Sequence, residues 1–128
     1  MVAGPRNCSL TALVVDGDTT SNMIEQGLLR SFGVITYGVD NGRAAIDLFA
    51  SGAKFDLILI DLILPVINGL ETTRQIRAMG VKTKMLGVTA CSREREEKAF
   101  LAAGVDEFIE KPLDSNRLAS ILMELNAN

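Results

Sequence analysis

Apolar runs and amphipathic segments alternate along the chain, and this alternation predicts strands separated by helices. Apolar or β-branched runs predict five strands, over residues 10–15, 34–39, 55–60, 84–88 and 105–109. Apolar residues at helical spacing predict five helices, over residues 19–32, 41–51, 69–79, 93–103 and 113–125. The predicted order is therefore βαβαβαβαβα.

Individual residues support the boundaries of these elements. Ile24, Leu28 and Phe32 recur at steps of four in the first helix and predict its apolar face. The caps expected for the second, third and fourth helices are Asp40, Asn68 and Ser92.

The run FDLILI at residues 55–60 lacks the alternation of a half-exposed strand, which indicates burial on both faces. Short connections between alternating strands and helices favour right-handed crossovers and a parallel sheet. We therefore expect an α/β fold, a doubly wound (βα)5 domain with one five-stranded parallel sheet, spanning residues 10–126 after an N-terminal arm over residues 1–9. In such folds functional groups lie where the carboxyl ends of the strands meet the loops.

Four polar residues follow or end predicted strands: Asp16, Asp61, Thr89 and Lys111. Two carboxylates, a hydroxyl and an ammonium would thus meet at one edge of the sheet. Clustered carboxylates repel one another unless a proton or a cation lies between them. Because oxygen ligands suit a hard divalent cation, we expect Mg²⁺ at this edge, with Lys111 and Thr89 available to an anionic group.

Composition removes several other classes of protein. The 128 residues include no histidine, which excludes a Ser-His-Asp triad and a histidine metal site, and the net charge of −3 argues against nucleic acid as a partner. The longest near-apolar run, residues 57–67, is broken by Asp61 and Pro65 and is too short to span a bilayer. The two cysteines, Cys8 and Cys91, are expected to be free thiols in a reducing compartment. We expect a cytoplasmic protein, or a nuclear one in a eukaryote.

The sequence resembles the receiver domain of two-component response regulators, a flavodoxin-like three-layer sandwich. The resemblance rests on VVDGD, LILIDLILPVINGLE, GVTA and EFIEKPL, at residues 14–18, 57–71, 87–90 and 107–113. It implies that Asp61 accepts a phosphoryl group from a phosphohistidine. It also implies that Asp16, Asp61 and the backbone carbonyl of Ile63 hold Mg²⁺.

The same resemblance assigns three further residues. Thr89 matches the switch hydroxyl of the family, Phe108 matches its switch aromatic, and Lys111 matches its lysine at the active site. The expected partners are a histidine-containing phosphotransfer protein or a histidine kinase, and a downstream protein that the sequence does not identify. The chain is expected to act as a monomeric, stand-alone receiver or phosphate shuttle, without binding a membrane; the alternative is a receiver excised from a larger hybrid kinase. It takes part in its own phosphorylation but is not expected to be a turnover enzyme.

One position departs from the family pattern. Gly17 stands where receivers carry the second acid of a metal-binding pair, and Asp18 follows one residue later. Asp18 is either a substitute metal ligand or the cap of the first helix. If Asp18 does not compensate, Gly17 should weaken Mg²⁺ binding, and we favour this outcome.

Two alternatives to a phosphoaccepting receiver follow from the same residues. Asp16-Gly17-Asp18-Thr19-Thr20 also resembles the D-x-D-x-T motif of haloacid dehalogenase-type phosphatases, in which Asp16 would be the nucleophile and Asp18 the general acid/base. This alternative leaves Asp61 without a role. The other is a pseudo-receiver, a protein-binding module with impaired phosphotransfer, and Gly17 is its support.

Overall fold

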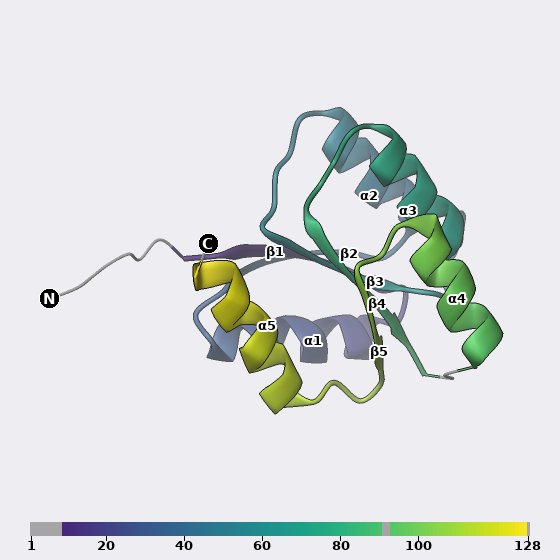
Figure 1. Ribbon diagram of the computed structural model, residues 1–128. Coiled ribbons are helices and arrows are strands. Elements are labelled where there is room, and N and C mark those ends of the chain that lie inside the picture. The colour runs from purple at the N-terminus through teal and green to yellow at the C-terminus, as the bar shows by residue number, and fades with distance from the viewer. Residues whose placement is uncertain (1–8, 91–92, 128) are drawn as a thin grey trace, which may run out of the picture.

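The computed structural model describes residues 9–90 and 93–127, which form one parallel sheet with helices on both faces (Figure 1). The strands are β1 (Thr11–Val15), β2 (Ile35–Val39), β3 (Leu57–Asp61), β4 (Lys84–Thr89) and β5 (Glu107–Glu110). They pair in the order β2-β1-β3-β4-β5, and every pairing is parallel. The predicted five-stranded doubly wound fold is confirmed.

The helices are α1 (Thr19–Ser31), α2 (Gly42–Ala50), α3 (Gly69–Ala78), α4 (Glu94–Ala103) and α5 (Ser115–Ala127). Figure 1 shows α1 and α5 on one face of the sheet, and α2, α3 and α4 on the other. Within the described part of the chain, no helix is both long and apolar enough to cross a membrane.

Strand alternation divides the apolar core into two halves, because successive side chains point to opposite faces of a sheet. Leu57 and Leu59 of β3 pack with Leu29 of α1 and the apolar residues of α5, whereas Ile58 and Ile60 pack toward α2, α3 and α4. All four β3 residues are fully buried. This double-sided burial is what the run FDLILI predicted.

The predicted apolar face of α1 was wrong for Ile24 and Phe32, although Leu28 packs against the core and the helix itself is where the sequence placed it. Ile24 is 64% exposed and Phe32 is 43% exposed, whereas the buried residues are Asn22, Glu25 and Leu29. Two of these three are polar, so α1 directs hydrogen-bonding groups toward the end of β1.

Details of the helix caps also differ from the expectations. The α2 cap is Asn41, whose side chain accepts a hydrogen bond from the backbone N–H of Ala44, and not Asp40. Asn68 caps α3 as predicted. Ser92, together with Cys8 and Cys91, lies outside the described residues. The fifth strand begins at Glu107, two residues later than predicted.

Candidate functional site

The carboxyl ends of β1, β3 and β5 bring two acids and a lysine together. Asp16 follows β1, and Asp61 ends β3 one residue beyond the pair Val15–Ile60, so the two acids lie side by side on adjacent strands. Lys111 follows β5, and its backbone N–H donates a hydrogen bond to the carbonyl oxygen of Thr89 at 2.8 Å. Parallel pairing therefore places these residues at one edge, as the sequence predicted.

The Lys111 ammonium lies at the centre of this cluster. Its Nζ is 2.8 Å from Asp61 Oδ2, 2.9 Å from Asp16 Oδ2 and 2.9 Å from Ser21 Oγ. Glu25 Oε2 lies 3.8 Å from the same nitrogen. An ammonium has three donors, and the two strand-end acids and the serine hydroxyl accept all of them.

Burial and the lysine together set the protonation of these groups. Burial would raise the pKa of Asp16, which is 1% exposed, but the hydrogen bonds from the Asp18 N–H and from Lys111 lower it overall. Burial raises the pKa of Asp61 by more than Lys111 lowers it. The pKa of Lys111 is raised, because its bonds to Asp61 and Asp16 outweigh its burial. Lys111 therefore stays charged.

Two members of the cluster, Ser21 and Glu25, were not predicted as site residues. Both lie on α1, four residues apart, and Ser21 Oγ is 3.3 Å from Glu25 Oε2. Burial raises the pKa of Glu25 to about 8, with the charge of Asp16 as the next cause. A signal was present in the sequence, since Asn22, Glu25 and Leu29 have the spacing of one helical face.

Asn22 ties α1 to the strand ends. Its Nδ2 donates to the carbonyl oxygens of Asp16, at 3.0 Å, and Val39, at 2.9 Å. The amide thus holds the residue after β1 against the end of β2. Buried polar groups require such partners.

Asp18 caps the first helix. Its carboxylate accepts a hydrogen bond from the backbone N–H of Ser21 at 3.0 Å, and its own N–H donates to Asp16 Oδ1 at 2.9 Å. This is the second of the two roles that the sequence left open. A metal role for Asp18 remains a prediction that the geometry does not support, because the carboxylate is directed to the helix terminus.

Gly17 lies against the loop that follows Asp61. A Cβ atom added at Gly17 would be 2.7 Å from Pro65 Cδ and 3.4 Å from the carbonyl oxygen of Asp40. Pro65 therefore occupies the space that a side chain at position 17 would need.

The loop after Asp61 is tightly constrained. The Ile63 N–H donates to Asp61 Oδ1 at 3.1 Å, and a Cβ atom at Gly69 would overlap the carbonyl oxygen of Asp61. Val66 has a φ of 72°, in the left-handed region that β-branched residues rarely adopt. Ile63 is 77% exposed, so its side chain lies on the surface, outside the cluster.

The predicted switch residues lie on β4 and β5. Thr89 is 2% exposed at the end of β4. Phe108 is partly buried and packs edge to face against Phe100 of α4, with ring centroids 6.2 Å apart. Phe100 is fully buried over Gly87, where an added Cβ would be 2.6 Å from its ring. A displacement of Phe108 would therefore change its contact with Phe100 and so affect the packing of α4.

The oxygen donors available to a metal are few. Within residues 9–90 and 93–127, no group of three or more His, Cys, Asp or Glu side chains is arranged to hold a metal ion. The donors that the resemblance assigns to the metal are the carboxylates of Asp16 and Asp61, with the Ile63 carbonyl two residues along. Hard oxygen donors of this kind fit Mg²⁺, which keeps several water ligands when the protein supplies few.

A (βα)5 sheet whose strand ends hold two acids bridged by a lysine defines a class of phosphoryl-handling domain. The sequence matches the response regulator receiver domain over residues 12–123, and the chain belongs to this family. Two-component response regulator 24 of Arabidopsis thaliana is 44% identical over 117 residues, covering 91% of this chain and 84% of that protein. The resemblance and the fold class predicted from the sequence are thereby confirmed, together with a role as a receiver in two-component signal transduction.

Two solved structures are similar to this one. The receiver domain of the sensor histidine kinase PA1611 from Pseudomonas aeruginosa PAO1 is 28% identical, with a TM-score of 0.83 over 94% of this chain and all of that chain; its crystal structure has a magnesium ion coordinated in the active site cleft. A chain from the co-crystal structure of Saccharomyces cerevisiae Ypd1 with the Ssk1 receiver domain has a TM-score of 0.83 at 22% identity, covering 93% of this chain and 90% of that chain. The second similarity concerns the fold alone.

Proposed function

We propose that Asp61 accepts a phosphoryl group from a phosphohistidine on another protein. The observation that carries this proposal is the position of Lys111, whose Nζ bridges Asp61 Oδ2 and Asp16 Oδ2 at the edge of the sheet. The donor histidine lies outside these 128 residues, which contain no histidine. The haloacid dehalogenase-type alternative has no comparable support, since its general acid/base, Asp18, caps α1.

In the reaction, an Asp61 carboxylate oxygen attacks phosphorus while the bond between phosphorus and the donor imidazole nitrogen breaks. The product is an acyl phosphate on Asp61 and a free donor histidine. The transition state spreads negative charge over three equatorial oxygens. Lys111 can take part of this charge at its present position, and the Thr89 hydroxyl can hydrogen-bond a second oxygen.

Asp16, Asp61 and the Ile63 carbonyl would hold Mg²⁺, which supplies charge neutralisation at the phosphoryl oxygens. These two carboxylates provide fewer charges than the acid pair and acceptor that the family pattern implies. We therefore expect weak Mg²⁺ binding with this set of ligands.

Phosphorylation would be sensed by Thr89, Lys111 and Phe108. The backbone N–H of Lys111 donates a hydrogen bond to the carbonyl oxygen of Thr89, so a movement of one residue would displace the other. Phe108 would carry the change to α4 through its contact with Phe100.

The donor would dock over an apolar rim around Asp61, formed by Met23, Ile24, Ile63 and Val66. These four side chains are 64–79% exposed. They come from α1 and the loop after β3. Shift mapping with a histidine-containing transfer protein should show a footprint on this rim, and a footprint confined to α5 would contradict it.

The remaining assignments rest on the proposed chemistry. The chain would act as a phosphoacceptor and not as a turnover enzyme. It would signal, as a monomer, through a downstream protein or pass its phosphate on. We propose the cytoplasm, or the nucleus of a eukaryote, as the compartment in which it meets these partners.

The decisive experiment is phosphorylation of the wild type and of Asp61→Asn. Acetyl phosphate or a phosphorylated transfer protein should give the wild type a hydroxylamine-labile label, which Asp61→Asn lacks. Asp47→Asn, on the exposed face of α2, is the matched control and should be labelled normally. Label at the wild-type level in Asp61→Asn would contradict the proposal. A wild type that takes no label from either donor would identify a pseudo-receiver.

A further inference from the structure

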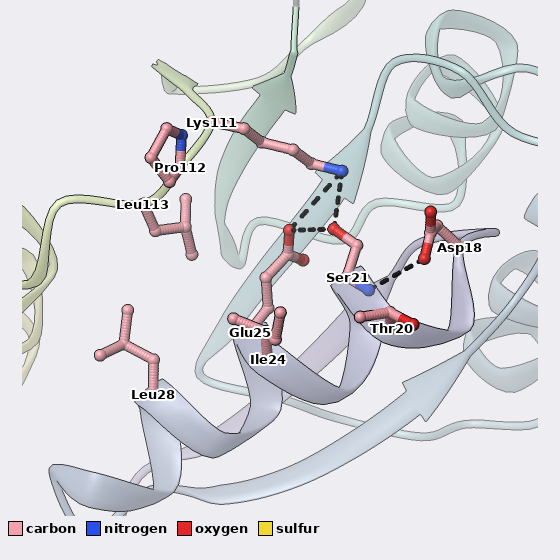
Figure 2. Close-up of a pocket in the computed structure, with 9 residues that line it drawn as sticks. All are labelled: Asp18, Thr20, Ser21, Ile24, Glu25, Leu28, Lys111, Pro112 and Leu113. Atoms are coloured by element: carbon pink, nitrogen blue, oxygen red, sulfur yellow. Dashed lines mark hydrogen bonds and ion pairs between the residues drawn. The ribbon is translucent and has the colours of Figure 1, made fainter.

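Glu25 is a buried acid that the proposed phosphotransfer does not use. It is 4% exposed and lies on the inner face of α1. Burying a carboxyl group without partners is unfavourable. Its partners are Ser21 of α1 and Lys111 of the segment after β5, which Figure 2 shows reaching toward Glu25 in a groove of about 410 Å³ between these two elements.

The three groups form a chain of hydrogen bonds with a defined direction. An ammonium can only donate, so Ser21 Oγ accepts from Lys111 Nζ at 2.9 Å. The hydroxyl proton of Ser21 is then directed to Glu25 Oε2, at 3.3 Å. Oε2 also lies 3.8 Å from Nζ, so the carboxyl group faces the ammonium directly.

Helix geometry fixes this chain in place. Ser21 and Glu25 are four residues apart, so their side chains lie one above the other on the same face of α1. The helix is held at its start by the Asp18 cap on the Ser21 N–H and by the Asn22 side chain on the Asp16 carbonyl. The contact to Lys111 thus belongs to a rigid helix and not to a loop.

We infer that Ser21 and Glu25 are positioning residues for Lys111. This inference rests on the proposed function. When Asp61 is phosphorylated, its carboxylate becomes part of an acyl phosphate and its ion pair with Lys111 is lost. Ser21 and Glu25 keep their contacts, so the ammonium stays at the strand ends, where a phosphoryl oxygen can reach it. Without them, a flexible four-carbon side chain would be held only by the acids at the reacting centre.

The test compares variants that remove or retain the hydroxyl. Ser21→Ala should slow phosphorylation by acetyl phosphate about tenfold, because small displacements of a group that contacts the reacting atoms have large effects on rate. Ser21→Thr keeps the hydroxyl and should restore the rate to within about twofold of the wild type, on the same argument. Glu25→Gln, which keeps an acceptor for Ser21, should have an intermediate effect. Ser31→Ala, near the end of α1, is the control.

A second background separates positioning from a general structural effect. In the Lys111→Met background, adding Ser21→Ala should cause no further loss of phosphorylation rate, because Ser21 acts on the rate through the lysine. If Ser21→Ala lowers the phosphorylation rate equally in the wild type and in Lys111→Met, or lowers it in neither, the inference is overturned. Urea unfolding of each variant reports whether the fold is retained.

An NMR measurement tests the inference independently of phosphorylation. The Lys111 ammonium resonance should shift, and its proton exchange should become faster, in Ser21→Ala but not in Ser21→Thr or Ser31→Ala. An unchanged resonance in Ser21→Ala would overturn the positioning role even if the wild type is phosphorylated. A wild type that takes no label, with the resonance shifted, would contradict only the proposed function.

Discussion

Replacing Gly17 with aspartate tests whether the departure from the receiver pattern limits metal binding. Two opposing effects are expected. The new carboxylate adds a charged oxygen ligand beside Asp16 and Asp61, which should tighten Mg²⁺ binding at least about tenfold, or about 1.4 kcal/mol. Without the metal, the same carboxylate adds repulsion to the cluster.

The structure also gives a steric contribution. The added Cβ would be 2.7 Å from Pro65 Cδ. Carbon atoms in contact are normally about 3.5–4.0 Å apart, so Pro65 and residue 17 must separate by about 1 Å. Overpacking of this kind typically lowers the free energy of unfolding by about 1–3 kcal/mol. Pro65→Ala removes the ring and should recover most of that loss in the double variant.

The assay combines urea unfolding in a chelator with calorimetric titration of Mg²⁺. Gly17→Asp should be less stable than the wild type in the chelator and bind Mg²⁺ more tightly, and Pro65→Ala should restore the stability without removing the affinity. Gly27→Asp is the matched control, since an added Cβ at Gly27 meets nothing within 4 Å. Unchanged stability and unchanged affinity in Gly17→Asp would refute the reasoning. If Asp18→Ala instead abolishes Mg²⁺ binding while Gly17→Asp changes little, Asp18 is the ligand.

Three further predictions concern the switch, the loop after Asp61 and the acid stability. Lys111→Ala should uncouple the response of α4 to beryllofluoride, and equal amide shifts in the wild type and the variant would contradict this role. Val66→Asn should raise the free energy of unfolding by about 1 kcal/mol, measured in urea, because asparagine tolerates a positive φ better than valine. Hydrogen bonds from Lys84 and, to a lesser degree, Arg117 lower the pKa of Glu107 in the folded protein. This shift stabilises the fold. The stabilisation is complete above the pKa that Glu107 has in the unfolded chain, and it is lost as the pH falls through the lower pKa of the folded state. Glu107→Gln should therefore lose about 0.5–1 kcal/mol at neutral pH, and its stability should fall less than that of the wild type between about pH 5 and pH 3.

The order of elements was predictable because hydrophobic periodicity and chain connectivity determine it together. Strands such as residues 57–60 must be buried on both faces, and short connections leave only parallel pairing with crossover helices. The same logic predicted that Asp16, Asp61 and Lys111 lie at one edge of the sheet. Exact strand ends were less predictable, because β5 begins where it pairs with β4 and not where its apolar run begins.

The contact between Gly17 and Pro65 could not be predicted from the sequence. The two residues are far apart along the chain and meet only because β1 and β3 are neighbours in the sheet. Any side chain larger than hydrogen at position 17 would therefore meet Pro65 of the loop after Asp61.

The inner face of α1 shows why part of the site was missed. Apolar spacing assigned Ile24 and Phe32 to the core, but the rule assumes that the buried face of a helix is the apolar one. Here the buried face carries Asn22 and Glu25, because it must satisfy the carbonyl of Asp16 and face the Lys111 ammonium. Leu29 stays in the core, whereas Met23 and Ile24 are exposed, and there we propose that a donor protein covers them. A helix that begins at a cluster of strand-end acids can thus bury polar residues while some of its apolar residues stay exposed, and polar residues at helical spacing beside such a cluster are candidates for the site.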